Sequence, residues 1–147
     1  MRIDAFLQQS PMFAVSRAAR RFDTLAGRAM AADKLNFLEG LTLAALFFDE
    51  PTPVKPSQLA ETFSTTRGNV SHCVSSLEAK GLLQRVIDPA DARSYLLGLT
   101  AAGRRTAMRV IKALDKLQAE FEQEAGKDAL HEALATLRQI EKVAEKK

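Results

Sequence analysis

A short polar segment in the middle of the chain carries the side-chain types that read duplex DNA: Arg67, Asn69, Ser71, His72 and Ser75. Arginine can donate two hydrogen bonds to guanine, asparagine can pair with the edge of adenine, and serine hydroxyls can hold phosphates. No acidic residue occurs from Arg67 until Glu78, so phosphate would meet no fixed negative charge along this stretch. Such contacts require a helix, because an α-helix fits the major groove of B-DNA.

The same segment has the periodicity of an amphipathic helix from about Arg67 to Lys80. Its apolar residues recur at i, i+3, i+4 and i+7, which places them on one face: Val70, Cys73, Val74 and Leu77. Thr66 closes a run of hydroxyl residues suited to the N-cap, and we count it among the DNA-contact candidates. Gly81 follows where a helix commonly ends in the left-handed conformation.

A shorter helix, residues 56–63, precedes this segment, and a β-hairpin follows it. Two apolar runs, residues 82–87 and 94–99, flank a loop at residues 88–93 that contains proline and aspartate. Arg93, on this projecting loop, is suited to the narrow, electronegative minor groove. Arg85 is a further DNA-contact candidate, and we interpret Asp91 as an orienting partner for Arg93 or Arg85.

Helical patterns fill the two ends of the chain. Apolar residues recur at helical spacing through the N-terminal third, and a second helix is expected from about Lys34 to Phe48, ended by Pro51 and Pro53. Thr100 can cap a final helical region that breaks near Gly126. We expect one domain over residues 1–147, with a DNA-binding lobe at 33–103 and dimerisation helices at 1–32 and 104–147. These terminal helices carry more apolar surface than so small a lobe could cover.

Composition sets outer limits on the function. The net charge of +3 is too small to establish nucleic-acid binding by itself, and the single cysteine excludes a disulfide framework or a multi-cysteine zinc site. No apolar run approaches the roughly 20 residues that span a bilayer. The first residues lack the apolar core of a signal peptide, so we expect a cytoplasmic protein without a membrane partner.

Three motifs resemble the MarR family of bacterial winged helix-turn-helix regulators: Leu77–Arg85, Asp88–Arg93 and Leu99–Arg104. The similar spacing runs from Leu59 to Arg104, and the flanking helices fit in number and length. The resemblance implies an obligate homodimer with interleaved terminal helices, bound to a pseudo-palindromic operator. It also implies a repressor relieved by a small-molecule effector, commonly aromatic or phenolic. His72 and Ala92 stand where the family often has arginine, which reduces the fixed positive charge.

Several residues have more than one interpretation. An arginine like Arg93 is ordinarily a solvated surface residue, but the wing motif around it favours DNA contact. His72 can be a DNA contact, a pH-sensitive modulator or a surface residue, and we favour contact. Cys73 fits a buried hydrophobe better than a thiol sensor. Six residues could line a ligand pocket, although core or dimer interface is the commoner role of such side chains: Phe6, Met12, Phe13, Phe22, Met30 and Phe37.

The sequence therefore predicts a mainly α protein with a small β-hairpin wing that binds double-stranded DNA as a homodimer. Two-fold symmetry would separate the half-sites by about 10 to 10.5 base pairs. The alternative is a winged-helix module that docks a protein instead of DNA, which predicts an apolar or acidic recognition face. We find no convergent catalytic acid and base, no metal-ligand set and no cofactor motif, so we expect no enzyme activity.

Overall fold

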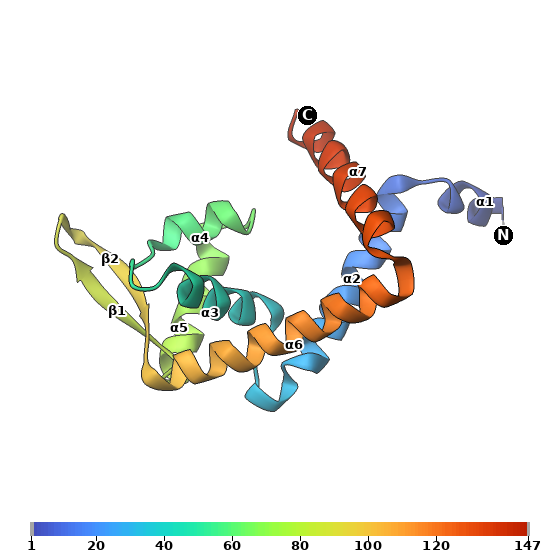
Figure 1. Cartoon of the computed structure of the whole chain (residues 1–147). Helices are drawn as coiled ribbons and strands as arrows, with labels where there is room; N and C mark the ends of the chain where they lie inside the picture. Colours follow the sequence, from blue (N-terminus) through green and yellow to red (C-terminus); the bar gives the residue numbers. More distant parts are fainter. Residues whose placement is uncertain (1, 147) are drawn as a thin grey trace. The chain divides into compact units, whose positions relative to one another are not determined.

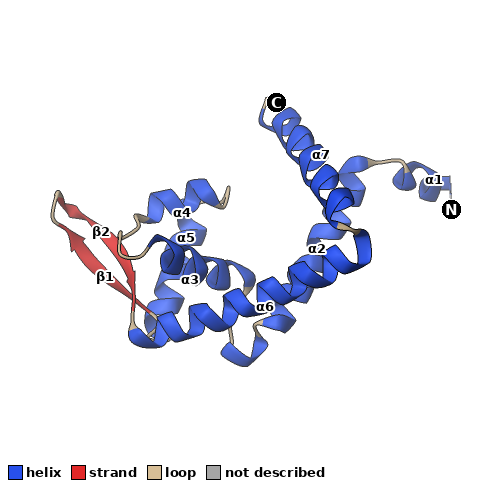
Figure 2. Ribbon diagram, in the orientation of Figure 1, coloured by secondary structure: helices blue, strands red, loops and turns tan. Residues whose placement is uncertain are grey.

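Helices make up most of the chain in the computed structural model, which describes residues 2–146, and the strands form one antiparallel hairpin (Figures 1 and 2). This confirms the mainly α fold with a small wing. In chain order the elements are α1 (Arg2–Gln8), α2 (Pro11–Ala29), the 3₁₀ turn η1 (Ala31–Asp33), α3 (Phe37–Asp49), α4 (Pro56–Thr62), α5 (Arg67–Ala79), β1 (Leu83–Asp88), β2 (Asp91–Leu99), α6 (Ala101–Ala125) and α7 (Lys127–Glu145).

The chain divides into two compact units, one up to Ile111 and one from Lys112 onward. The first contains α1 to α5, the hairpin and the beginning of α6. The second contains the rest of α6 and α7. Within the described residues, no helix is both long enough and apolar enough to span a membrane.

Helices α3, α4 and α5 and the hairpin share the core of the first unit. The apolar stripe of α5 is buried as predicted, and it is joined by buried side chains from the other elements, among them Leu43, Leu59, Leu97 and Val110. Helix α3 begins at Phe37, three residues later than expected, because Asn36 is its N-cap. The Asn36 side chain accepts a hydrogen bond from the Glu39 amide, and the Glu39 carboxylate accepts one from the Asn36 amide. This reciprocal pair is a capping box, which fixes where the helix starts.

The turn of the wing is shorter than the sequence predicted. Strand β1 extends to Asp88 and β2 begins at Asp91, so only Pro89 and Ala90 lie between them. The expected loop at residues 88–93 was therefore wrong. The Asp88 carboxylate accepts hydrogen bonds from the Ala90 amide and the Ser94 hydroxyl, and these bonds close the hairpin. Arg93 consequently lies on β2 instead of on a loop.

A tight joint connects the end of α5, the base of the wing and the start of α6. Gly81 has the predicted positive φ, at 70°. The Thr100 hydroxyl donates to the Gly81 carbonyl at 2.7 Å and accepts from the Gly103 amide at 2.9 Å, as expected for an N-cap. A side chain at position 103 would overlap the carbonyl oxygen of Leu82, so this approach requires glycine. These contacts give a physical reason for the Leu-Thr-x-x-Gly motif at residues 99–103.

The terminal helices leave apolar side chains exposed. Helix α7 contains no buried residue, although its apolar stripe includes Leu134 and Leu137, which are 48% and 37% exposed. In α2 only Ala26 is buried. The six pocket candidates are divided: Met30 belongs to the core, Phe13 and Phe37 are half-buried, and the other three are exposed, namely Phe6, Met12 and Phe22.

Candidate nucleic-acid interface

The outward face of α5 carries the polar side chains that the sequence singled out. Five of them are exposed on the surface of this helix: Arg67, Asn69, Ser71, His72 and Ser75. The opposite face is buried in the lobe, so these side chains project from a fixed support. The helix therefore presents polar groups without an acidic neighbour at its N-terminal end, as major-groove reading requires.

Thr66 and Asn69 also shape the start of this helix. Thr66 is the N-cap, and its hydroxyl oxygen accepts a hydrogen bond from the Asn69 amide at 3.1 Å. The Asn69 side-chain amide donates to the Thr65 hydroxyl at 3.0 Å. The Thr66 hydroxyl retains its proton for donation, and the Asn69 amide retains a second proton and its oxygen. Both side chains thus stabilise the start of the helix and can still form a hydrogen bond with a ligand.

Arg85 is tied to α5. Its guanidinium forms an ion pair with Glu78 at 3.1 Å, donates to the Ser75 hydroxyl at 3.0 Å and lies 4.8 Å from the centre of the Tyr95 ring. The structure thus brings the predicted residues Arg85 and Ser75 together. It also shows that the acidic partner of Arg85 is Glu78, so Asp91 does not have that role.

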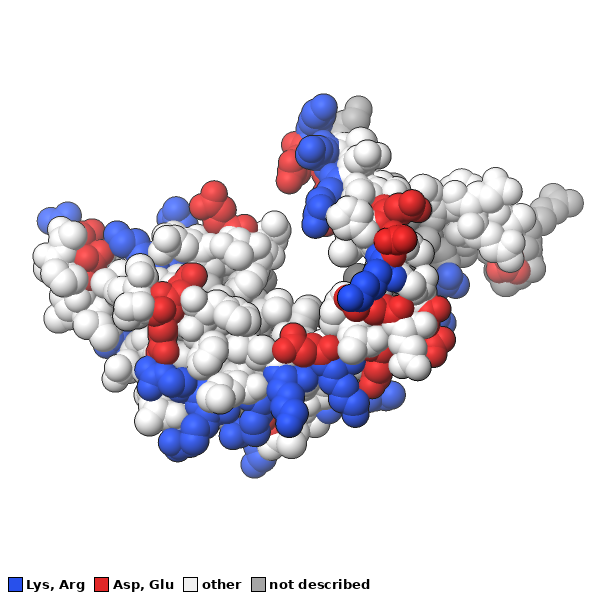
Figure 3. Space-filling model, in the orientation of Figure 1, with Lys and Arg blue, Asp and Glu red and all other residues white. Residues whose placement is uncertain are grey.

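Asp91 orients Arg93 through the backbone. Its carboxylate accepts a hydrogen bond from the Arg93 amide at 3.0 Å, while the Ser94 hydroxyl donates to the Asp91 carbonyl. The expected side-chain partnership between Asp91 and an arginine is replaced by this backbone contact. Figure 3 shows basic and acidic side chains close together at the outer end of the wing. The Arg93 side chain itself is exposed.

A hollow of about 460 Å³ lies where the beginnings of α4 and α5 meet the wing. Three cationic side chains line it, Lys55, Arg67 and Arg93, together with the hydroxyl residues Ser57 and Ser71. Cations and hydroxyls from three separate elements around one hollow can hold a phosphate group. Sequence reasoning found Arg67, Ser71 and Arg93 but missed Lys55.

Lys55 is positioned by the wing. Its ammonium lies 3.0 Å from the carboxylate of Asp88, whose side chain is 6% exposed. Hydrogen bonding from the Ala90 amide, followed by that from Lys55, lowers the pKa of Asp88. Asp88 therefore stays ionised and fixes both the hairpin turn and a cation at the edge of the hollow.

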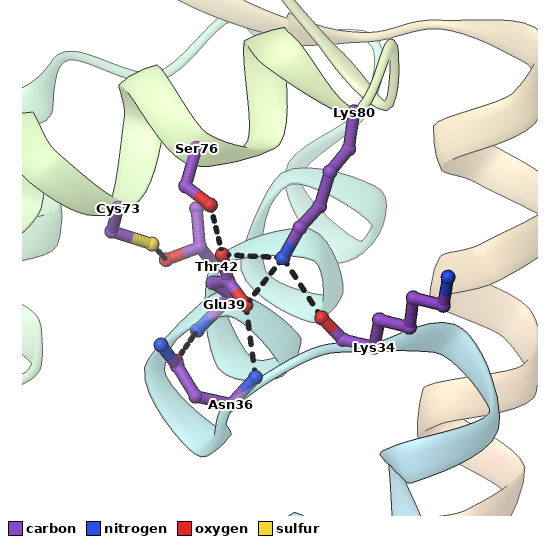
Figure 4. A network of polar contacts seen from close by, with 7 residues as sticks. All are labelled: Lys34, Asn36, Glu39, Thr42, Cys73, Ser76 and Lys80. Atoms are coloured by element: carbon purple, nitrogen blue, oxygen red, sulfur yellow. Dashed lines mark hydrogen bonds and ion pairs between the residues drawn. The ribbon is translucent and has the colours of Figure 1, made fainter.

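A second polar network lies beneath α5 and was also missed from the sequence (Figure 4). It joins the buried carboxylate of Glu39 in α3 to Ser76 of α5 and to Lys80, the C-cap residue of that helix. The Asn-x-x-Glu spacing at residues 36–39 is a capping-box signal that could have located Glu39. Its pairing with residues about forty positions later has no local signature.

Cys73 is buried, as predicted, and its sulfur lies 3.5 Å from the Thr42 hydroxyl. Burial raises the pKa of this thiol. The thiolate is the reactive form of cysteine, so the position favours packing over redox chemistry. Among residues 2–146, no group of three or more His, Cys, Asp or Glu side chains is placed to hold a metal ion.

Comparison with known proteins finds similarity to one family of regulators. The family model described as MarR family matches residues 48–95, which span α4, α5 and most of the wing. The uncharacterised HTH-type transcriptional regulator YdcH of Bacillus subtilis is 28% identical over 114 residues, covering 76% of this chain and 78% of that protein.

Two solved structures resemble the whole chain. The PcaV transcriptional regulator of Streptomyces coelicolor, in complex with its natural ligand, is 25% identical with a TM-score of 0.82, covering 94% of this chain and 96% of that one. The repressor CouR of Rhodococcus jostii, bound to a 23-mer DNA duplex, is 26% identical with a TM-score of 0.77, covering 91% and 94%.

Proposed function

We propose that the chain is a member of the MarR family of winged-helix proteins, which it resembles in sequence at residues 48–95 and in fold, and that it regulates transcription by binding double-stranded DNA as a homodimer. The observation that carries this proposal is the hollow in which Arg67 of α5 and Arg93 of β2 converge with Lys55. A winged-helix module that docked a protein would instead be expected to present an apolar or acidic face. The outward face of α5 is polar and carries no acid from Arg67 to Ser76.

The proposed complex places the N-terminal part of α5 in the major groove. Arg67 and Asn69 would read base edges, with Ser71, His72 and Thr66 near the same bases or the adjoining phosphates. Arg93 would reach the minor groove beside the wing. Arg85 and Ser75, which bond each other, would contact the DNA backbone as a unit.

The homodimer is inferred from uncovered apolar surface. A helix with an apolar stripe must bury it against another element, and α7 has no buried residue in the single chain. We infer that a second copy covers this stripe. The operator would then be pseudo-palindromic, with half-sites about one helical turn apart.

Repression relieved by a small-molecule effector is the proposed mode of regulation. Its support is the ligand-bound structure of PcaV and the DNA-bound structure of the repressor CouR, both similar to this chain over nearly its whole length. The aromatic or phenolic character of the effector remains a proposal from the family resemblance. Titrating phenolic acids into the protein–DNA complex would test it, since an effector must weaken DNA binding to relieve repression.

A salt series on Arg93→Ala tests the DNA-binding proposal. The wild-type chain should bind duplexes selected from a random pool, with affinity that falls steeply as salt rises. Loss of one cation from the DNA interface should weaken binding and reduce the logarithmic salt slope by about 0.9. The thermal transition should hardly change, because Arg93 is exposed.

Lys127→Ala is the matched control for this series. It also removes one cation, but from an exposed position at the start of α7, so the salt slope should stay at the wild-type value. A wild-type affinity that did not respond to salt would contradict the proposal, because counterion release would then be absent.

A further inference from the structure

The buried Glu39 carboxylate is fully occupied by hydrogen-bond donors (Figure 4). The Ser76 hydroxyl donates to it at 2.6 Å, and the Lys80 ammonium donates to both oxygens, at 2.8 and 3.0 Å. The Asn36 amide supplies a further bond at 2.9 Å. Burial opposes the charge most strongly, but the bonds from Lys80, Ser76 and Asn36 outweigh it and lower the pKa of Glu39.

Two of these donors come from the last part of the recognition helix α5. Ser76 and Lys80 are four residues apart, so both side chains face α3 from the same side of α5. Lys80 also donates to the carbonyl of Lys34 at 2.8 Å. The C-terminal end of α5 is thus attached to the start of α3 and to the turn that precedes it.

These bonds leave Lys80 without a proton for another acceptor. An ammonium has three protons, and its three acceptors are the two oxygens of Glu39 and the carbonyl oxygen of Lys34. Lys80 would otherwise be an obvious phosphate contact, as a cation at the end of a DNA-binding helix. Instead, its ammonium group is bonded to Glu39 and to the carbonyl of Lys34.

Core packing holds the buried face of α5, and the attachment at its C-terminal end adds a constraint on the tilt of the helix. A helix of this length extends about 20 Å, so a tilt of about 5° at the attached end moves the opposite end by about 1.7 Å. Hydrogen bonds to base edges tolerate far less displacement than this. The exposed reading side chains, Arg67 and Asn69, lie at that opposite end.

We propose that Glu39 and Lys80 are positioning residues for DNA recognition, which fix the orientation of α5 without touching DNA. The proposal rests on the DNA-binding function proposed above. It differs from a phosphate-contact role for Lys80 in one measurable respect. A positioning residue changes affinity and base discrimination while the number of phosphates neutralised, and so the salt slope, stays the same.

The test measures the full-length chain on duplexes that the wild type selects from a random pool, and on the same duplexes with one half-site base pair changed. Glu39→Gln and Lys80→Met should each weaken binding to the selected duplex by about tenfold, and should reduce the penalty for the changed base pair. The double variant should lose no more than either single one, because the two residues act as a unit. Lys80→Arg, which keeps the cation, should recover part of the affinity.

If a Glu39 variant does not fold, Ser76→Ala provides a second test of the proposal. It removes one donor from the carboxylate and should weaken binding by about threefold with a near-normal thermal transition. Glu50→Gln is the matched control. It breaks another ion pair, the one between Glu50 and Arg104, which involves neither α5 nor the turn before α3, and should leave DNA affinity unchanged.

The outcomes separate the two proposals. Failure of the wild type to bind any duplex would overturn DNA binding, and the positioning role with it. A wild type that binds, with Lys80→Met lowering the salt slope by about one and Glu39→Gln without effect, would overturn positioning alone and make Lys80 a phosphate contact. Unchanged affinity and discrimination in folded Glu39 and Lys80 variants would also overturn it.

Discussion

The winged-helix lobe and the terminal helices of this chain differ in how far their side chains are buried within the single chain. Within the lobe, even the carboxylates of Glu39 and Asp88 are buried with hydrogen-bond partners, and no buried side-chain nitrogen or oxygen of the described residues lacks one. Helix α7 has an apolar stripe and no buried residue. The buried polar groups of the lobe, charged ones included, are therefore satisfied within the chain, whereas the apolar stripe of α7 is left for another surface to cover.

The largest expected effect is on the lobe, from Gly103→Ala. The added methyl group would overlap the carbonyl oxygen of Leu82, so the joint between the wing and α6 could not close. We expect the free energy of unfolding to fall by more than about 3 kcal/mol, measured by chemical denaturation.

Gly98→Ala is the control for this substitution, because no atom lies within 4 Å of the added carbon. It should change the free energy of unfolding by less than about 1 kcal/mol. Equal free energies of unfolding for the two variants would show that the close approach of Gly103 to Leu82 does not stabilise the lobe.

A smaller effect, on assembly, is expected from Leu134→Glu in α7. If a second copy covers this stripe, a charge there should raise the dimer dissociation constant by at least about tenfold. Light scattering over a dilution series measures the change, and circular dichroism verifies that the lobe stays folded. Gln139→Glu adds the same charge on the opposite side of α7 and should leave the dimer intact. A wild-type chain that stays monomeric at micromolar concentration would contradict the inference that a second copy covers the apolar stripe of α7.

The smallest expected effect is a pH dependence inside the lobe. Since folding lowers the pKa of Glu39, its ionised form contributes stability above the unfolded-state pKa of 4.5 and loses it as pH falls through the folded-state pKa. The difference in unfolding free energy between wild type and Glu39→Gln should therefore be constant near neutral pH and shrink in acid. Glu61→Gln, at an exposed position, provides the reference. A difference that grew in acid would contradict the proposed pairing.

Much of the fold could be predicted from short-range patterns. The 3.6-residue period of α5, the left-handed Gly81, the cap at Thr100 and the break at Gly126 are all confirmed, because each depends on residues a few positions apart. The limits of the hairpin were wrong for a local reason that the sequence does contain. Asp88 bonds the Ala90 amide and shortens the turn to two residues.

The candidate site was predicted only in part. The exposed residues of α5 and Arg93 were found from residue type and spacing, while their roles toward DNA remain a proposal. Lys55 was missed, since its position beside the wing depends on a pairing with Asp88 across the fold. Of the two partners considered for Asp91, its carboxylate accepts a hydrogen bond from the Arg93 amide, whereas Arg85 pairs with Glu78.

By itself the sequence determined which segments are helix or strand and which face of α5 is polar, since periodicity and capping act within a few residues. Only the tertiary structure decided how that polar face is held. The carboxylate of Glu39 can remain charged in the interior because Ser76 and Lys80 reach it from another helix. Contacts between residues so far apart in the chain exist only after the helices have packed.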